Sequence, residues 1–306
     1  LTYISLVVLG LLVLLFSGCK SVISQGVTGR VTSADPGQGI SGVKIIYSGS
    51  RSGTTTTNYR GEWFIPANDG EWLVIKAEKP HFMFHPLEMR VVVGRDNHQD
   101  FKVVAFRDDF EDPSSGWLVD YDYKYTTDKE DNIYLMKTTN YLAVTAPVKS
   151  STCYTAQATM YKDPFLGSGN GKYGLIFNMT TFDDIHYAFC VNSEGMYEIV
   201  EFVNRIPTVK HSGTHPYIST VNILGVDQNG TNVVLYLNGG WVGELTVYDH
   251  GNVDSLHVGL YAEANSGTYY ANYDDFKLTS LGLRLLPQFR QLDINTTRVN
   301  GGNKTE

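Results

Sequence analysis

The sequence has no concentrated run of lysine and arginine. Its 24 basic residues are outnumbered by 32 acidic residues, so the formal net charge is −8. Recognition of a phosphate backbone needs a concentrated basic surface. The composition therefore excludes nucleic acid as a partner.

Cysteine is scarce, with three residues in the chain. Cys153 opens one predicted strand and Cys190 closes another, two strands later. In a simple meander those strands run parallel, so the two thiols lie at opposite ends, beyond the span of a disulfide. A disulfide formed in an oxidising compartment is the alternative, but we favour two separate buried thiols. The spacing fits no zinc site and no Cys/His or Ser/His/Asp nucleophile motif.

Helical periodicity longer than two turns is absent after residue 20. The chain instead has 20 Tyr and 30 Gly, with many Val, Thr and Asn residues between short apolar runs. Aromatic and β-branched residues between frequent turn-formers are typical of short strands. We therefore predict an all-β protein, and the length after the N-terminal segment is enough for two domains.

An apolar run, Leu6–Phe16, precedes a cysteine near the N-terminus. It has the length of a signal-peptide core and is shorter than the roughly 20 residues of a membrane-spanning helix. Small residues at 17 and 18 stand immediately before Cys19. This segment resembles the lipobox of bacterial lipoproteins. The resemblance implies a signal peptide over 1–18, a lipid on Cys19, a tether over 19–25 and a membrane-anchored location in the bacterial cell envelope, outside the cytoplasm. An uncleaved anchor helix is the alternative.

The first predicted domain, 24–105, alternates short strands with turns. Its segments are VTGRV, GISGVKI, TTTTNYRGEWFIP and GEWLVIKAEKPHF. Their order resembles the carboxypeptidase regulatory-like (transthyretin-like) family of small β-sandwiches. The resemblance implies a turn at Gly61 with positive φ, followed by a strand with Trp63 and Ile65 facing inward. No catalytic residue transfers, and a spacer or adhesion role is implied.

The second predicted domain, 106–280, has strands of five to nine residues between turn clusters, which predicts a sandwich of two antiparallel sheets. Its segments are DDF and GW at the start, YGLIF, HYAFCV and GMYEIV, then VVLYLNGGWVGEL and a closing DDF. They resemble the concanavalin A-like lectin/glucanase jelly roll. Lectins and glycosidases share that fold, so the fold does not settle the function.

Retaining glucanases of this fold carry carboxylates on one strand in an E-x-D-x-x-E pattern. The nearest segment here is Tyr197–Phe202, in which Glu198 and Glu201 are three residues apart. A regular strand directs such residues to opposite faces, and the middle aspartate is missing. We therefore predict a non-catalytic protein and keep a glycoside hydrolase with an unrecognised site as an alternative.

Glycan binding needs aromatic faces and polar groups. Six candidate residues lie on predicted loops or strand ends: Tyr121, Tyr123, Tyr125, Trp241, Tyr269 and Tyr270. Three of them, Tyr121, Tyr123 and Tyr125, alternate and are expected on one face of a strand. Ordinary packing is the alternative for each residue.

Acidic residues stand at both ends of the second domain. First and last strands often pair in jelly rolls, so we expect Asp109 and Glu111 to approach Asp274 and Asp275. Oxygen ligands of this kind hold calcium, whereas exposed or turn carboxylates are the alternative. No other cofactor is expected.

The C-terminal tail, 281–306, is polar and rich in Gly and Asn, which predicts partial disorder. The leading hypothesis is an envelope lipoprotein whose second domain binds a glycan or polysaccharide. A structural or adhesive protein that contacts other proteins is the alternative.

Overall fold

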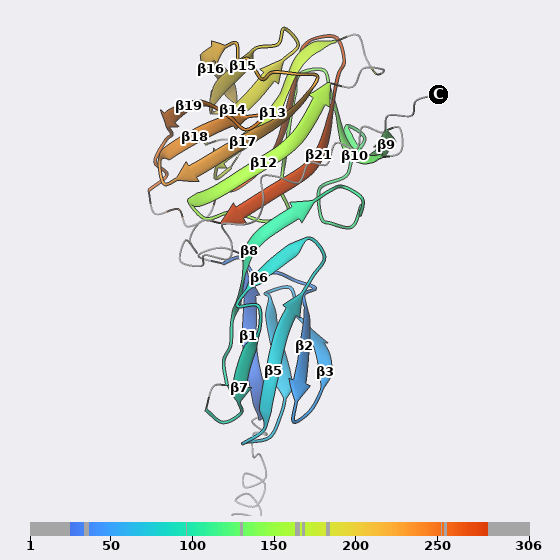
Figure 1. Ribbon diagram of the computed structural model, residues 1–306, viewed down its shortest axis with the longest axis vertical. Helices are drawn as coiled ribbons and strands as arrows, with labels where there is room; N and C mark the ends of the chain where they lie inside the picture. Colours follow the sequence, from blue (N-terminus) through green and yellow to red (C-terminus); the bar gives the residue numbers. More distant parts are fainter. Residues whose placement is uncertain are drawn as a thin grey trace, which may run out of the picture.

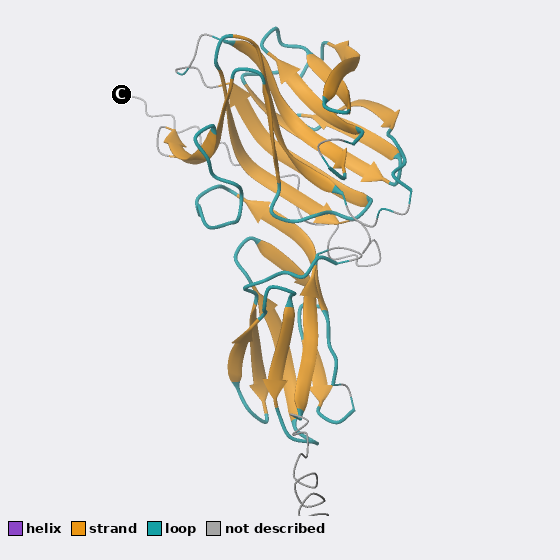
Figure 2. Cartoon of the chain, turned by 180° about the vertical axis from the view of Figure 1, so that it is seen from behind, coloured by secondary structure: helices purple, strands orange, loops and turns teal. Residues whose placement is uncertain are grey.

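The computed structural model describes residues 25–280, except for 34–36, 96, 129–130, 163–165, 167–168, 182–183, 252 and 254–255. The expected all-β class is confirmed, because the described elements are strands and no α-helix is among them (Figure 2). Within these residues no helix has the length and apolar character needed to cross a membrane. The predicted signal peptide, Cys19 and the tail 281–306 lie outside the described residues.

The N-terminal part forms the smaller body at the bottom of Figure 1. A four-stranded sheet, in the order β3-β2-β5-β7, packs against the strands β1, β4 and β8. The bounds are β1 Gly26–Thr32, β2 Lys44–Gly49, β3 Gly53–Thr56, β4 Glu62–Pro66, β5 Trp72–Glu78, β6 Phe82–His85, β7 Met89–Val92 and β8 Phe101–Asp108.

The strand β4 shows how local sequence sets this packing. Trp63 and Ile65 are 4% and 0% exposed, as expected from a period of two. The preceding turn places Gly61 at φ 77°, which confirms the predicted positive φ. Both side chains belong to the main hydrophobic core.

The larger body is a sandwich of two antiparallel sheets. One is six-stranded in the order β11-β20-β13-β14-β15-β16, and the other includes β19-β18-β17-β12-β21, with β10 and β9 beside β21. The bounds are β9 Tyr123–Asp128, β10 Asp131–Thr138, β11 Tyr141–Thr145, β12 Cys153–Lys162, β13 Asn170–Met179, β14 His186–Asn192, β15 Tyr197–Val203, β16 Ile206–Gly213, β17 Val221–Asn229, β18 Asn232–Leu237, β19 Gly240–Thr246, β20 His257–Ser266 and β21 Tyr269–Ser280.

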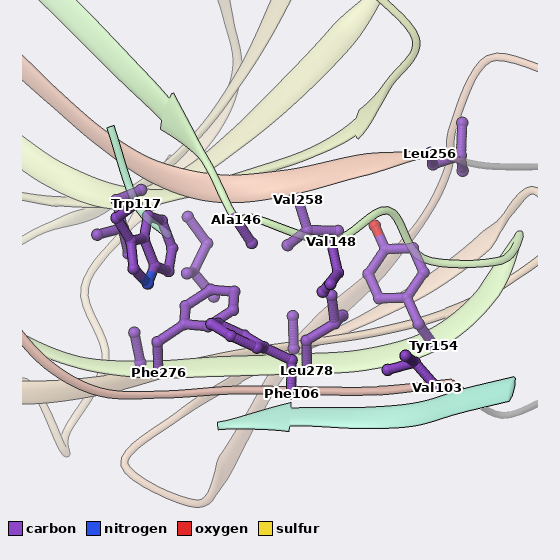
Figure 3. Close-up of a cluster of buried hydrophobic side chains, with 14 of the residues drawn as sticks. Val103, Phe106, Trp117, Ala146, Val148, Tyr154, Leu256, Val258, Phe276 and Leu278 are labelled. Carbon is purple, nitrogen blue, oxygen red and sulfur yellow. The ribbon is translucent and has the colours of Figure 1, made fainter. Parts of the chain in front are cut away.

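Strand β8 joins the two bodies. It pairs in parallel with β1 at Val31↔Phe101 and antiparallel with β21 at Phe276↔Asp108, so one hydrogen-bonded sheet runs through both bodies. The expected boundary between 105 and 106 therefore falls inside a strand. Phe106 of β8 packs in the core of the larger body, beside Phe276 and Leu278 of β21 (Figure 3).

The hairpin between β18 and β19 turns at Asn238 and Gly239, with φ values of 50° and 78°. Two consecutive positive φ values are typical of the type I′ turn that an Asn-Gly pair predicts. Asn238 also ties the turn to β17, because its Oδ1 accepts a hydrogen bond from Ile223 N at 2.7 Å.

Both described cysteines are free thiols, as expected, but only Cys190 is buried as predicted, because Cys153 is half-buried. The physical reason differs from the predicted one. Cys153 begins β12 in one sheet, whereas Cys190 lies on β14 in the other sheet and points away from the sandwich core.

Candidate functional site

The six-stranded sheet has an outer face, the face turned away from the core of the sandwich. The outer face carries its own buried cluster, centred on Phe202 of β15 and Tyr261 of β20. Their ring centroids are 5.6 Å apart, and His186 stacks on Phe202 at 4.7 Å. The small residues Gly174 and Ala188 lie on β13 and β14, the two strands between β20 and β15.

Four polar side chains lie at one end of the outer face: Lys172, Asn192, Glu198 and Glu263. We call them the outer-face polar cluster. Lys172 Nζ is 2.9 Å from Glu198 Oε2 and 3.0 Å from Glu263 Oε2. Asn192 Nδ2 donates to Glu198 Oε1 at 2.7 Å. The side chain of Lys172 is 6% exposed and those of Glu198 and Glu263 are 13% and 19% exposed, so the cluster is almost closed to solvent.

The pKa of Lys172 reflects both its burial and its two glutamate partners. Burial alone would lower the pKa of Lys172, but its hydrogen bonds to Glu198 and Glu263 raise that pKa above its ordinary value. Burial raises the pKa of the nearby Cys190 thiol well above its usual range, so that thiol carries no charge. Lys172 is therefore a cation held between two carboxylates.

The glucanase-like segment behaves as the spacing predicts. Glu198 joins Lys172 on the outer face, whereas Glu201 accepts from Tyr187 Oη at 3.1 Å and from Lys210 Nζ at 2.9 Å. Tyr187 belongs to the main core, so the two glutamates point to opposite faces of β15. The carboxylate that approaches Glu198 is instead Glu263, from a strand that lies far away in the sequence.

The predicted tyrosine row on β9 does not form one exposed face. Tyr123 and Tyr125 pack against the main core, and Tyr125 Oη lies 2.7 Å from Ser115 Oγ. Tyr121 precedes the strand and is 78% exposed. The expectation of three tyrosines presented together is corrected, because the inward face of β9 is covered by the aromatic rings of Phe110 and Tyr134.

The two neighbouring tyrosines of β21, Tyr269 and Tyr270, point to opposite faces of the sheet and differ in burial. Tyr269 is 1% exposed and lies in the core, so it is not placed to meet a ligand. Tyr270 is half-buried and pairs across the strands with Lys137. Lys137 Nζ donates to Tyr121 Oη at 3.3 Å and lies 4.4 Å from the centroid of that ring. The structure therefore brings Tyr121 and Tyr270 together around one lysine.

Trp241 at the start of β19 is 60% exposed, and Tyr217 in the loop between β16 and β17 is 57% exposed. We call these two residues the hairpin aromatic pair. The ring of Tyr217 lies against Gly240, where an added Cβ would be 2.3 Å from Cδ2. His215 Nε2 lies 3.1 Å from the carbonyl of Trp241, and Asn238 Nδ2 donates to Tyr217 O at 2.6 Å. These contacts hold the loop on the hairpin.

The predicted calcium ligands are not gathered as a set. In the described part of the chain, one group of metal-ligating side chains has all its ligand atoms within 4.8 Å, and it consists of His81, Asp108 and Asp109. Asp109 is the only predicted ligand in it. Glu111 accepts a hydrogen bond from Asn132 Nδ2, and Asp274 accepts one from the backbone of Asp275. The pairing of Phe276 with Asp108 brings the strand that carries Asp274 and Asp275 beside the start of the domain, as expected. Calcium binding stays a prediction, tested by calorimetric melting with and without a chelator, in which an unchanged transition would exclude it.

Comparisons with known proteins show similarity of fold only. No family model matches the sequence, and no curated protein matches it. Solved structures similar to this chain include carbohydrate-binding module CBM66 from Bacillus subtilis, with 16% identity over 54% of this chain and 96% of that chain and a TM-score of 0.43. A Bacteroides ovatus mixed-linkage glucan GH16 protein has 7% identity, covers 56% and 99%, and has a TM-score of 0.45. The Bacillus licheniformis β-glucanase has 9% identity, covers 58% and 98%, and has a TM-score of 0.40. At these values the comparisons carry no argument about ligand or activity.

Sequence reasoning missed Lys172, Asn192 and Glu263. Their signal was present as polar residues alternating with apolar ones, as in NGKYGLIF and HVGLYAEA. Alternation assigns a residue to a face but does not tell which strands are neighbours. The order β20-β13-β14-β15 is what brings these side chains together.

Proposed function

We propose that this chain is a non-catalytic carbohydrate-binding protein and that the hairpin aromatic pair is its ligand platform. The exposure of Trp241 and Tyr217 is the observation that carries the proposal. The larger body withdraws most of its large aromatic side chains from solvent; Tyr134, Tyr154, Tyr261, Tyr269 and Tyr273 are at most 1% exposed. Exposed aromatic side chains held in place by hydrogen bonds are the groups on which sugar rings stack.

The platform is rigid, which supports binding. Asn238 and Asn222 share a hydrogen bond at 2.9 Å, and Asn222 Oδ1 accepts from Ser219 N at 2.9 Å. The loop that carries Tyr217 is thereby fixed to the hairpin that carries Trp241. A platform ordered before binding loses less conformational entropy when the ligand arrives.

The outer-face polar cluster supports the non-catalytic part of the proposal. A glycosidase needs one carboxylic acid and one carboxylate on either side of a scissile bond, with room for the sugar between them. Here Lys172 occupies the space between Glu198 and Glu263 and bonds to both. Lys172 thereby fills the position that a glycosidic oxygen would need between the two side chains.

An envelope location completes the proposal. We propose that residues 1–18 are a signal peptide and that Cys19 carries a lipid that anchors the chain to a membrane. The smaller body, which we propose to be transthyretin-like, follows directly and acts as a spacer. Because β8 is shared by both bodies, the larger body is presented beyond it in one continuous sheet.

A structural or adhesive role is the second candidate. Strand β16 favours it, because every residue from Ile206 to Ser212 is exposed and Ile206 and Val209 are 68% and 50% exposed. Such an edge offers a partner strand both apolar contacts and backbone hydrogen bonds. Pro207 and Lys210 on the same strand are residues that discourage pairing.

The test is binding of the full chain to immobilised polysaccharides and to a glycan array. We expect Trp241→Ala and Tyr217→Ala each to reduce retention by about twofold to tenfold, since stacking on one aromatic ring is worth on the order of 0.5–1.5 kcal/mol. Tyr59→Ala is the matched control, because Tyr59 is 75% exposed on the smaller body. Absence of binding to every glycan, or equal loss in the control, would overturn the proposal.

A further inference from the structure

Lys172 and Asn192 of the outer-face polar cluster stand directly opposite each other on adjacent strands. They are Cα partners in the antiparallel pair of β13 and β14. Directly opposite side chains lie on the same face of a sheet with Cβ atoms about 4.5–5.5 Å apart. A lysine amine therefore has the reach to approach the side-chain amide carbon of this asparagine.

Glu198 touches both groups at once. Its Oε2 accepts from Lys172 Nζ at 2.9 Å, and its Oε1 accepts from Asn192 Nδ2 at 2.7 Å. One carboxylate is thus placed to take a proton from the amine and to deliver a proton to the amide nitrogen. Proton transfer by a positioned carboxylate is general acid–base catalysis.

The oxygen of the same amide is polarised. Asn192 Oδ1 accepts hydrogen bonds from the backbone N–H groups of Glu194 and Met196, each at 3.0 Å. Two backbone donors on one carbonyl oxygen form an oxyanion hole, which stabilises the negative charge that develops when a nucleophile adds to the carbon. Lys172 is 5% exposed and Asn192 is 8% exposed, so competing water is largely excluded.

We propose that Lys172 and Asn192 become joined by a side-chain amide bond that the folded chain forms by itself. Lys172 passes one proton to Glu198, and the neutral Nζ adds to Cγ of Asn192. The π electron pair of the Cγ–Oδ1 bond moves to Oδ1. It then returns to re-form that double bond as the Cγ–Nδ2 bond breaks. Glu198 protonates Nδ2, which leaves as ammonia. The second Nζ proton passes to Glu198 and then to solvent, so the carboxylate is regenerated. One C–N bond forms, one breaks, and no oxidant or cofactor is needed.

The neighbouring charges explain why the reaction needs Glu198. Glu263 and Glu198 raise the pKa of Lys172 although burial opposes this, so loss of the proton to bulk water is disfavoured. Direct transfer along the 2.9 Å hydrogen bond to Glu198 forms the amine and an uncharged acid together. Burial favours such a neutral pair over separated charges. The product ties β13 to β14 covalently and closes the intervening chain into a loop, which stabilises the fold as a disulfide would.

The test is peptide mass analysis of the full chain purified in detergent. In wild type we expect trypsin to leave the bond after Lys172 uncut. The peptide that holds Lys172 and Asn192 should weigh one ammonia less than its sequence, without backbone fragment ions between the two residues. Lys172→Arg, Asn192→Ala and Glu198→Gln should each abolish the loss. A wild-type peptide of full mass that is cut after Lys172 would overturn the proposal.

Two controls separate this bond from other events. Asn192 precedes Ser193 and could lose ammonia by cyclising on its own backbone; that loss would persist in Lys172→Arg and would overturn the proposal. Loss of water in place of ammonia would show that Lys172 had joined a glutamate carboxyl group. That result would also overturn the proposal. Glu201→Gln is the matched control on the same strand, because Glu201 pairs with Lys210 on the other face. In Glu201→Gln the ammonia loss should remain complete. Near-ultraviolet circular dichroism shows which variants fold, and the wild-type measurement depends on none of them.

Discussion

Tyr141 of β11 and Phe202 of β15 lie with their ring centroids 6.0 Å apart, although three strands separate β11 from β15. In a flat sheet those two strands would be about 19 Å apart, at about 4.8 Å for each spacing. Contact between the rings therefore requires a strongly curved sheet whose outer face is concave. The rings of this face fill the concavity, since Phe202 is 1% and Tyr261 is 0% exposed.

Removal of the ring of Phe202 should destabilise the protein strongly. Phe202→Ala takes away the contacts with Tyr141, His186 and Tyr261, and a buried Phe→Ala change costs about 3–5 kcal/mol in the free energy of unfolding. Urea denaturation measures it. Ile206→Ala, at an exposed position near the same strand, is the control and should change the free energy by less than about 0.5 kcal/mol. Similar values for the two variants would contradict a packed outer face.

Stability should fall in acid through His257. Burial, with a smaller contribution from Lys149, lowers the pKa of His257 to about 4, whereas the unfolded chain has the ordinary value near 6.5. The unfolded state therefore binds the proton first. The contribution of neutral His257 to the free energy of unfolding is complete above about pH 6.5 and is lost progressively as the pH falls to about 4. The total loss is no more than about 3 kcal/mol.

His257→Asn removes this titration. Chemical denaturation should be measured for wild type and variant between pH 7 and pH 4. The unfolding free energy of wild type minus that of the variant should decrease as the pH falls. A difference that stays constant with pH would refute the assignment. Burial lowers the pKa of His186 in the same direction, so the variant should keep part of the acid sensitivity.

The hairpin turn allows a test of backbone conformation alone. Gly239 has φ 78° and an added Cβ would meet nothing within 4 Å. Gly239→Ala should therefore cost about 1 kcal/mol from the left-handed conformation only. Gly243 on β19 is also open around its Cβ position but has no positive φ. Gly243→Ala should be neutral or stabilising by about 0.5 kcal/mol. Thermal melting of the two variants compares them, and equal shifts would contradict this explanation.

The proposed anchor on Cys19 has a direct test. Cells grown with labelled palmitate should yield labelled wild-type protein, because a lipobox cysteine carries acyl chains. Cys19→Ser should be unlabelled and should leave the membrane fraction. Equal labelling of the two proteins would remove the lipid from the proposal.

Individual residues show how far sequence reasoning reached. Trp63 and Gly61 were placed correctly, because alternation and turn chemistry are local properties. Tyr123 and Tyr125 were expected on one face of a strand as ligand candidates, and that face packs inward. Alternation tells that two residues share a face but not whether another layer covers that face, and this difference decides between a ligand platform and a core.

The order of polar, apolar and turn residues along this chain was sufficient to predict its all-β class and the divergence of Glu198 from Glu201, because both depend on neighbours within a few residues. The pairing of β13 with β20 and β14 depends instead on contacts between segments up to 96 residues apart, made when the sheet closes on its core. That pairing places Lys172 against Asn192 and against the carboxylates of Glu198 and Glu263. The chemistry proposed for them exists only in the folded chain.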